Sequence, residues 1–394
     1  MAVDKSSQKG AKGIPRGRIA ILGLVTIAVY GSWFYSFGVL LDPIIVDTGW
    51  SEPSVAAVFS SSAVIAGFGS LAGGWLLDLW GSRIVFGVAA VFGGGALWLA
   101  ADAESAATFA LLGAVGGGVL ASLGFYHVTQ TAAVRVSPRA EDRAIAVLTI
   151  WGAFASVIYI PITAWLVTRL DWRLTLRILA ATTVVVLAVA AVMIDTRVRG
   201  DVERPRVLGN VGQTLRTGRA RRFLTSQALA GLGVGTILVY QVPAMTSAGL
   251  ALAAASFWAG FRGFAQLGGR LPLMPLVNRF GVANSLRIAY VAISAGSIAL
   301  AFAGNQVLAA AYAIAAGFGI GAVSPLVGMH SKNVFGARAM GTAMGLISLA
   351  FLLCNSAGPI AAAWVAGLTG SRAIPVAISG VIVGTASLVV RGSD

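Results

Sequence analysis

The chain has 394 residues, of which 57% are hydrophobic and only 11% are charged. A soluble globular protein carries about 25% charged residues, so this composition excludes an ordinary water-soluble fold and favours a lipid environment. The formal net charge of +14 would fit a nucleic-acid-binding protein, but the basic residues lie at the ends of apolar runs and form no single basic face.

Long apolar segments recur along the chain after a basic, polar tail over residues 1–17. A membrane-spanning helix needs about 20 predominantly apolar residues, and we predict twelve such spans. They cover residues 18–41, 52–77, 84–101, 105–134, 142–168, 174–194, 222–247, 251–277, 283–303, 306–330, 339–369 and 372–391. The sequence therefore predicts an all-α, multi-pass protein of a cell membrane, such as the inner membrane of a bacterium.

The placement of charge predicts which side of the membrane each loop faces. With the N-terminus inside, the inner segments hold 22 of the 28 basic residues, whereas the outer loops hold four basic and six acidic residues. Short loops rich in Lys and Arg are cytoplasmic, so both termini are expected inside. Two basic residues, Arg262 and Arg270, belong to neither side because they lie within the eighth span.

The longest polar stretch, residues 195–221, follows the sixth span. It predicts a cytoplasmic linker between two six-helix bundles, 18–194 and 222–391. Internal duplication is common among secondary transporters, whose substrate site lies near the bilayer midplane between the repeats. Fold, duplication and the absence of an ATP-binding cassette predict a gradient-driven or facilitative transporter with no cofactor and no metal site.

A glycine-rich pattern occurs between the second and third spans and again, in degenerate form, between the eighth and ninth. The first copy holds Gly73, Asp78, Gly81 and Arg83, and the second runs over 269–281 with Asn278 in place of the aspartate. Glycine provides the geometry of a tight turn. Asp78 is expected to cap a helix or to pair with a nearby arginine.

These loops resemble the G-x-L-x-D-x-x-G-x-R loop of the major facilitator superfamily, with Trp75 as a minor departure. The resemblance covers the whole chain and implies two pseudo-symmetric six-helix bundles that transport by alternating access. A narrower likeness, to the monocarboxylate transporter and oxalate:formate antiporter branch, rests on residues 30–38, 161–173 and 335–345. In that branch an arginine of span eight binds the substrate carboxylate, and Arg270 matches its position.

Three departures from this branch affect the expected coupling and cargo. Proton-coupled members have an acidic residue one turn before the span-eight arginine, where this chain has Gln266. A lysine in span one of many members aligns with Val39, and a lysine in span eleven of the oxalate exchanger aligns near Phe351. Proton coupling by the usual groups and recognition of a dicarboxylate are therefore not expected, although a proton remains a possible coupling ion.

Arg262, Gln266 and Arg270 are spaced i, i+4, i+8 and so form one stripe of the eighth span. A guanidinium presents a planar donor fork that fits a carboxylate, and no aspartate or glutamate of the predicted spans could neutralise the two arginines. We expect a bound organic anion as the partner. The alternative is that both arginines pack against backbone carbonyls or extend to the membrane interface.

Further candidates for the substrate site are polar and aromatic side chains at midplane depth. His127 could carry a proton or donate to substrate, or else bond a neighbouring helix. Aromatic and amide groups could supply the wall of an organic-anion pocket, with helix packing as the alternative for each. They are Tyr30, Trp33, Gln241 and Asn355.

Three classes of function compete. The first is a transporter of a small organic anion, a monocarboxylate by resemblance, acting as a monomer. The second is a drug or metabolite exporter of the same superfamily, which usually needs a membrane-embedded acid that this sequence lacks. An intramembrane enzyme would need a catalytic pair, and His127 and His330 lie on different spans.

Overall fold

The structure is a computed structural model that describes residues 15–137, 141–196, 217–335 and 340–390. Within these ranges it is entirely helical, without β-strands. The helices are α1 (Arg16–Val29), η2 (Tyr30–Tyr35), α2 (Phe37–Thr48), α3 (Glu52–Val88), η3 (Ala89–Gly94), α4 (Gly95–Ala100), α5 (Ala106–Gly124), α6 (Tyr126–Val136), α7 (Glu141–Val167), α8 (Trp172–Met193), α10 (Gly218–Ser247), α11 (Leu252–Arg270), α12 (Leu273–Ala301), α13 (Gln306–Phe335), α14 (Met340–Thr369) and α15 (Ala373–Val389).

The all-helical membrane fold predicted from hydropathy is confirmed. Ten segments of the described chain are long and apolar enough to cross a membrane, and α15 is a shorter apolar helix. The helix α11, at the predicted eighth span, is not among the ten. Its arginines and glutamine lower its hydropathy, as expected for a helix that turns a polar stripe inward.

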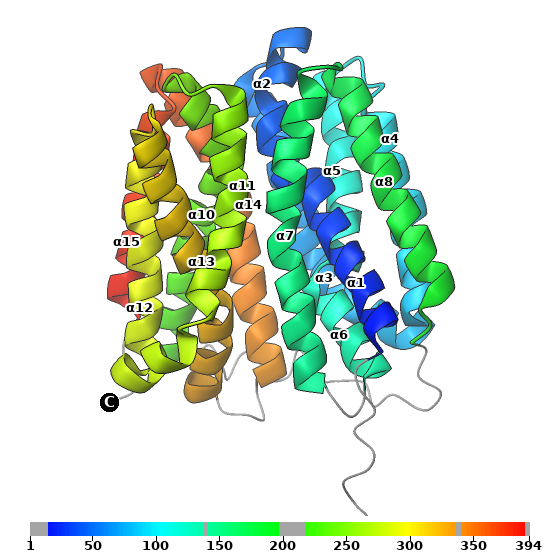
Figure 1. The fold of residues 1–394 in the computed structure, drawn as a ribbon, viewed down its shortest axis with the longest axis vertical. Coiled ribbons are helices and arrows are strands. Elements are labelled where there is room, and N and C mark those ends of the chain that lie inside the picture. Colours follow the sequence, from blue (N-terminus) through cyan, green and yellow to red (C-terminus); the bar gives the residue numbers. More distant parts are fainter. Residues whose placement is uncertain (1–14, 138–140, 197–216, 336–339, 391–394) are drawn as a thin grey trace, which may run out of the picture.

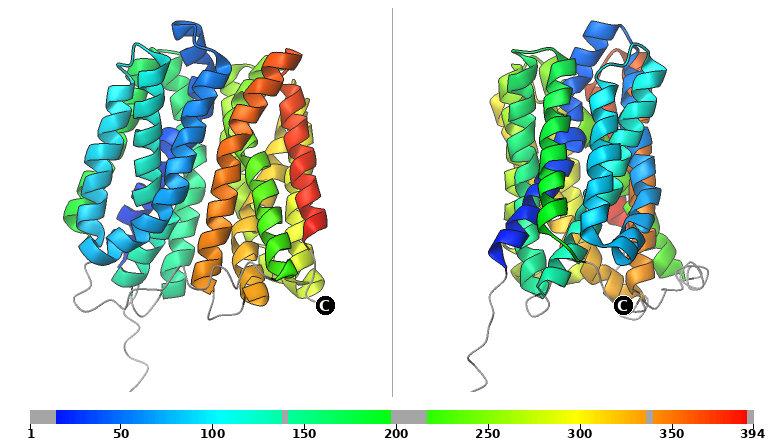
Figure 2. Two further views of the ribbon diagram at one scale, coloured as in Figure 1. Left: turned by 180° about the vertical axis from the view of Figure 1, so that it is seen from behind. Right: turned by 90° about the vertical axis from the view of Figure 1, so that its right-hand side faces the viewer.

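The helices form one upright bundle in which α1 to α8 lie on one side and α10 to α15 on the other (Figure 1). The two further views agree with this arrangement (Figure 2). Helix α1 begins and α15 ends at the same end of the bundle, called here the terminal end. The opposite end, called the far end, carries the connection between α14 and α15.

Burial separates central helices from peripheral ones. In the most apolar 18-residue stretch of α10, 83% is buried, whereas in that of α8 only 33% is buried. Large apolar side chains such as Val192, Val91 and Leu388 are exposed on the outer helices, which suits contact with lipid tails. Residues of α10 therefore belong to the interior of the bundle, where a substrate site is expected.

The structure interrupts the helix inside predicted spans, at Tyr30–Tyr35 and Phe125, where hydropathy gives no signal, and it turns the chain at Gly81 and Gly281, where the glycine-rich pattern predicts a turn. Residues Tyr30–Tyr35 form a π-helical segment in the first span, a feature that frequently marks functional sites. Phe125, with ψ of 177°, separates α5 from α6 inside one predicted span. Gly81 and Gly281 both have positive φ, 75° and 76°, and turn the chain within α3 and α12.

Candidate functional site

Helix α11 is built so that its polar stripe points into the bundle. Arg262 has no exposed surface and Gln266 is 6% exposed, whereas Phe257 and Phe264 on the opposite face are 54% and 47% exposed. Glycines on the buried face bring α11 close to α7, because a Cβ on Gly263 would collide with Ser156. The arginine therefore lies at the junction of the two sides of the bundle.

Arg262 is held by a small hydrogen-bond cluster. Its Nε donates to Oε1 of Gln241 at 3.0 Å, and the hydroxyl of Tyr312 donates to the same oxygen at 2.7 Å. The amide nitrogen of Gln241 donates to the carbonyl of Leu238 at 3.2 Å. Residues from α10, α11 and α13 thus fix the guanidinium in one orientation.

The terminal nitrogens of Arg262 are unsatisfied. Both Nη1 and Nη2 are buried without a hydrogen-bond partner among the described residues. The guanidinium carbon lies 5.8 Å from the ring of Tyr35 in the π-helical segment, on the other side of the bundle. A buried charge with two free donors costs several kcal/mol unless a partner arrives, so this position fits an anion.

Arg270 is half-buried and bonded to backbone. Its Nη1 donates to the carbonyl of Thr149 on α7 at 2.9 Å, and its Nε donates to the carbonyl of Gly321 on α13 at 3.4 Å. This is the carbonyl packing that the sequence left open as an alternative. The role in substrate binding that the resemblance implies for Arg270 stays a prediction, whereas the terminal donors of Arg262 have no partner among the described residues.

Aromatic rings adjoin Arg270. The hydroxyl of Tyr126 donates to the same Thr149 carbonyl at 3.3 Å. The ring of Tyr126 lies 5.3 Å from that of Tyr30, which stacks on Phe125 with centroids 3.7 Å apart. Tyr30 thus lies in an aromatic cluster near Arg270, and its contact with a substrate stays a prediction.

Two other candidates, Trp33 and His127, make contacts within their own side of the bundle. Trp33 donates to Ser62 at 2.9 Å. His127 Nε2 lies 2.8 Å from the carbonyl of Ser122, and because a carbonyl only accepts, this nitrogen carries the hydrogen. Each contact fits a packing role, and the structure does not bring these two side chains to Arg262.

Asn355 and Gln266 complete the predicted set. Asn355 donates to the carbonyl of Gly231 at 3.3 Å, while its buried Oδ1 has no partner in the described chain. Gln266 lies on the same buried stripe as Arg262. Its backbone packs so closely on Gly321 that a Cβ there would collide with the Gln266 carbonyl. Their roles as substrate ligands stay predictions.

The glycine-rich turn fastens helix ends to each other at the terminal end. Arg83 donates to the carbonyls of Ala191 and Val192 at 3.2 and 3.3 Å, and so satisfies the last turn of α8. In the second half, Arg287 donates to the carbonyl of Val390, beyond the end of α15, at 2.7 Å. Gly73 packs against the Ser122 carbonyl, and the side chain of Asp78 lies outside the described part.

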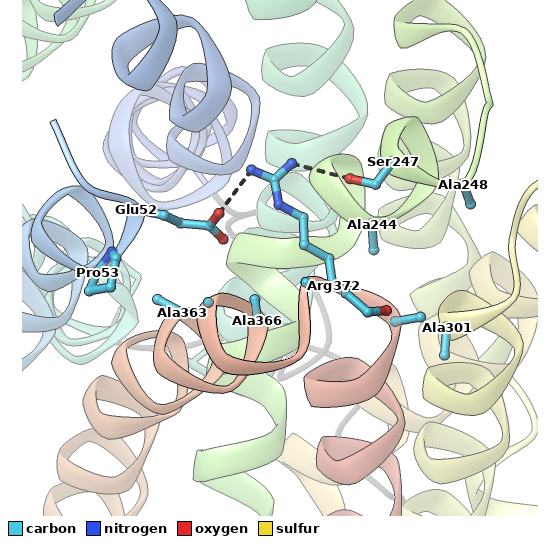
Figure 3. A pocket seen from close by; sticks show the side chains of 13 residues that line it. Glu52, Pro53, Ala244, Ser247, Ala248, Ala301, Ala363, Ala366 and Arg372 are labelled. Atoms are coloured by element: carbon cyan, nitrogen blue, oxygen red, sulfur yellow. Dashed lines mark hydrogen bonds and ion pairs between the residues drawn. The ribbon is translucent and has the colours of Figure 1, made fainter. Parts of the chain in front are cut away.

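At the far end, Arg372 joins the two sides of the bundle. Its Nη1 and Nη2 donate to the two carboxylate oxygens of Asp42 at 2.9 and 2.5 Å, and Nη2 also donates to Glu52 at 3.1 Å. Nη1 further donates to Ser247 on α10 at 3.2 Å. Figure 3 shows the Arg372 side chain reaching Glu52 and Ser247 beside a cavity of about 560 Å³ lined largely by alanine and glycine.

Sequence reasoning missed Tyr312, Tyr35 and the Arg372 ion pairs. In the sequence, Tyr312 resembles any other tyrosine of an apolar span, because its partner Gln241 lies 71 residues away. For Arg372 a signal did exist, because it is one of four basic residues in the predicted outer segments, which also carry acidic residues, and is therefore an ion-pair candidate. Which acidic residues pair with Arg372 depends on which helices meet at the far end.

The chain belongs to the major facilitator superfamily, whose family model matches residues 22–359. In sequence, the chain matches no curated protein. Its fold is similar to that of the nucleoside transporter NupG, at 15% identity and a TM-score of 0.78, covering 95% of this chain and 97% of that one. A D-xylose-proton symporter is also similar, at 12% identity and a TM-score of 0.75, with 95% and 97% covered.

A third structure of the same fold is a POT family transporter in complex with 5-aminolevulinic acid, at 12% identity and a TM-score of 0.75. It covers 97% of this chain and 96% of its own. At such low identities the likeness establishes the fold and not the cargo. The protein is therefore a multi-pass membrane protein of a transporter superfamily.

Proposed function

We propose that this protein transports a small organic anion, a monocarboxylate, by alternating access between its two six-helix bundles, either as a secondary active or as a facilitative carrier. The observation that supports this is Arg262, which is fully buried and whose Nη1 and Nη2 have no partner in the described part of the chain. These two nitrogens form the end-on edge of the guanidinium, which donates one hydrogen bond to each oxygen of one carboxylate.

The charge of the substrate follows from the partners of the two arginines. Arg270 has two donors engaged by carbonyls, whereas the terminal donors of Arg262 are free within the described chain. One guanidinium with a pair of free terminal donors is matched by one carboxylate. Tyr35, 5.8 Å from the guanidinium, supplies an apolar wall for the organic part of the ligand.

We orient the protein with its terminal end in the cytoplasm and its far end outside, on the strength of the distribution of Lys and Arg. The Arg372 pairs then close the outer entrance. Arg270, with Gln266 beside it on the same stripe, remains a second candidate ligand, deeper toward the cytoplasm.

The test is binding and uptake by the purified protein. We expect monocarboxylates such as acetate, pyruvate and benzoate to raise the melting temperature, and their neutral amides to raise it far less. Arg262→Gln should weaken anion binding at least about 30-fold, the cost of truncating one partner of a buried charge pair. Arg279→Gln, which removes an exposed arginine, is the matched control.

Uptake of the labelled acid into proteoliposomes should follow the same order of variants. Wild-type rates in Arg262→Gln would overturn the proposal. Stabilisation by neutral or cationic drugs, with none by carboxylates, would instead support the drug or metabolite exporter.

A further inference from the structure

The hydrogen bonds around Gln241 fix the orientation of its side-chain amide. Oε1 accepts from Arg262 and from Tyr312, and the amide nitrogen donates to the Leu238 carbonyl. Exchanging the oxygen and nitrogen would place the NH₂ group against the donor-only Nε of Arg262 and the amide oxygen against the Leu238 carbonyl, so the orientation is determined. Gln241 is 1% exposed, and both of its partners have no exposed surface, so water does not substitute for these bonds.

The amide satisfies the Nε side of Arg262 without neutralising it. An amide oxygen carries only a partial charge, so the three-residue cluster keeps a net charge of +1. A glutamate of nearly the same shape would accept the same two hydrogen bonds and cancel the charge. The residue at position 241 therefore determines how much charge remains for a ligand at Nη1 and Nη2.

We infer that Gln241 is the residue that makes the site selective for a monoanion, and that Tyr312 is a positioning residue that holds the Gln241 oxygen toward Arg262. This inference rests on the proposed function and extends it, because it assigns charge selection to groups that do not touch the substrate. The cluster combines residues from three helices of the second half, α10, α11 and α13.

The chain offers a matched control on the same helix. Gln227 on α10 is also buried, 2% exposed, and its amide nitrogen donates to the hydroxyl of Tyr290 at 2.5 Å. It lies 14 residues before Gln241, which is about 21 Å along a helix. Gln227→Glu therefore introduces the same carboxylate on α10, beside Tyr290 of α12 and far from Arg262.

The experiment measures thermal stabilisation and dissociation constants for acetate, pyruvate and benzoate, and for benzamide as a neutral analogue. Gln241→Glu should abolish stabilisation by the anions, whereas Gln227→Glu should keep it. Tyr312→Phe, which is nearly isosteric, should raise the anion dissociation constant about 3- to 10-fold, the effect of one lost hydrogen bond. Benzamide should bind wild type and Tyr312→Phe equally.

The outcomes separate the two proposals. If no anion binds to the wild type, the proposed function falls and this inference falls with it. If the wild type binds anions and Gln241→Glu binds them equally well, only the present inference is overturned. Should Gln241→Glu not fold, Tyr312→Phe decides: an unchanged anion constant, or an equal loss of benzamide and anion binding, overturns it.

Discussion

At the scale of single residues, two glycines have the same unusual backbone in the two halves. Gly81 has φ of 75° and ψ of 171°, and Gly281 has φ of 76° and ψ of 165°. This region is essentially restricted to glycine. The turn that each makes directs the following arginine, Arg83 or Arg287, toward carbonyls at or just beyond the end of the last helix of its half.

Gly81→Ala should therefore destabilise the protein by about 1–3 kcal/mol, the cost of forcing a side chain into this region. The melting temperature of the purified protein measures the effect. Gly87→Ala is the control in the same helix, because Gly87 has a helical backbone and its added Cβ would meet nothing within 4 Å. Equal stability of the two variants would show that the turn relaxes without cost.

At the scale of helices, the position of the polar stripe of α11 depends on close contact between α11 and α13. A Cβ on Gly269 would collide with the Phe318 carbonyl and lie 2.9 Å from the Ala322 nitrogen. A Cβ on the adjacent Gly268 would meet nothing within 4 Å. The two neighbouring glycines therefore distinguish a packing requirement from a general effect of glycine on the helix.

We expect Gly269→Ala to cost about 1–3 kcal/mol through overpacking and to lower the rate of transport, because it moves the helix that carries Arg262 and Arg270. Gly268→Ala should stay within about 0.5 kcal/mol of the wild type. Thermal unfolding and uptake into proteoliposomes check both. A Gly269→Ala protein with normal stability and uptake would contradict close packing at this point.

Helices could be predicted from the sequence because their signals are local. Apolar runs indicated the spans, and the spacing of Arg262 and Arg270 indicated a polar stripe. The interruption at Phe125 and the π-helical segment Tyr30–Tyr35 carry no such signal, because both depend on neighbouring helices. The pairing of Arg262 with Gln241 could not be predicted either, since the two residues lie on different helices and any polar group at that depth could have been the partner.

At the scale of the whole molecule, alternating access requires the two sides of the bundle to separate at one end and then at the other. Arg372 opposes separation at the far end, because its guanidinium binds Asp42 and Glu52 across the junction. Burial alone would lower the pKa of Arg372, but the two carboxylates outweigh burial and raise it. The arginine's contribution is thus complete below its unfolded pKa and would be lost only at strongly alkaline pH.

Removing this arginine should favour opening of the far end. Spin labels at Val46→Cys on α2 and Leu368→Cys on α14, both exposed positions near that end, report the separation in a Cys354→Ala background. Arg372→Gln should add a longer component to the distance distribution, because two carboxylates lose their shared partner. Arg169→Gln, which removes an exposed arginine from the same end, should not change it. If both variants give the wild-type distribution, the ion pairs do not hold the far end closed, and helix packing such as that of Gly38 against the Val239 carbonyl must do so.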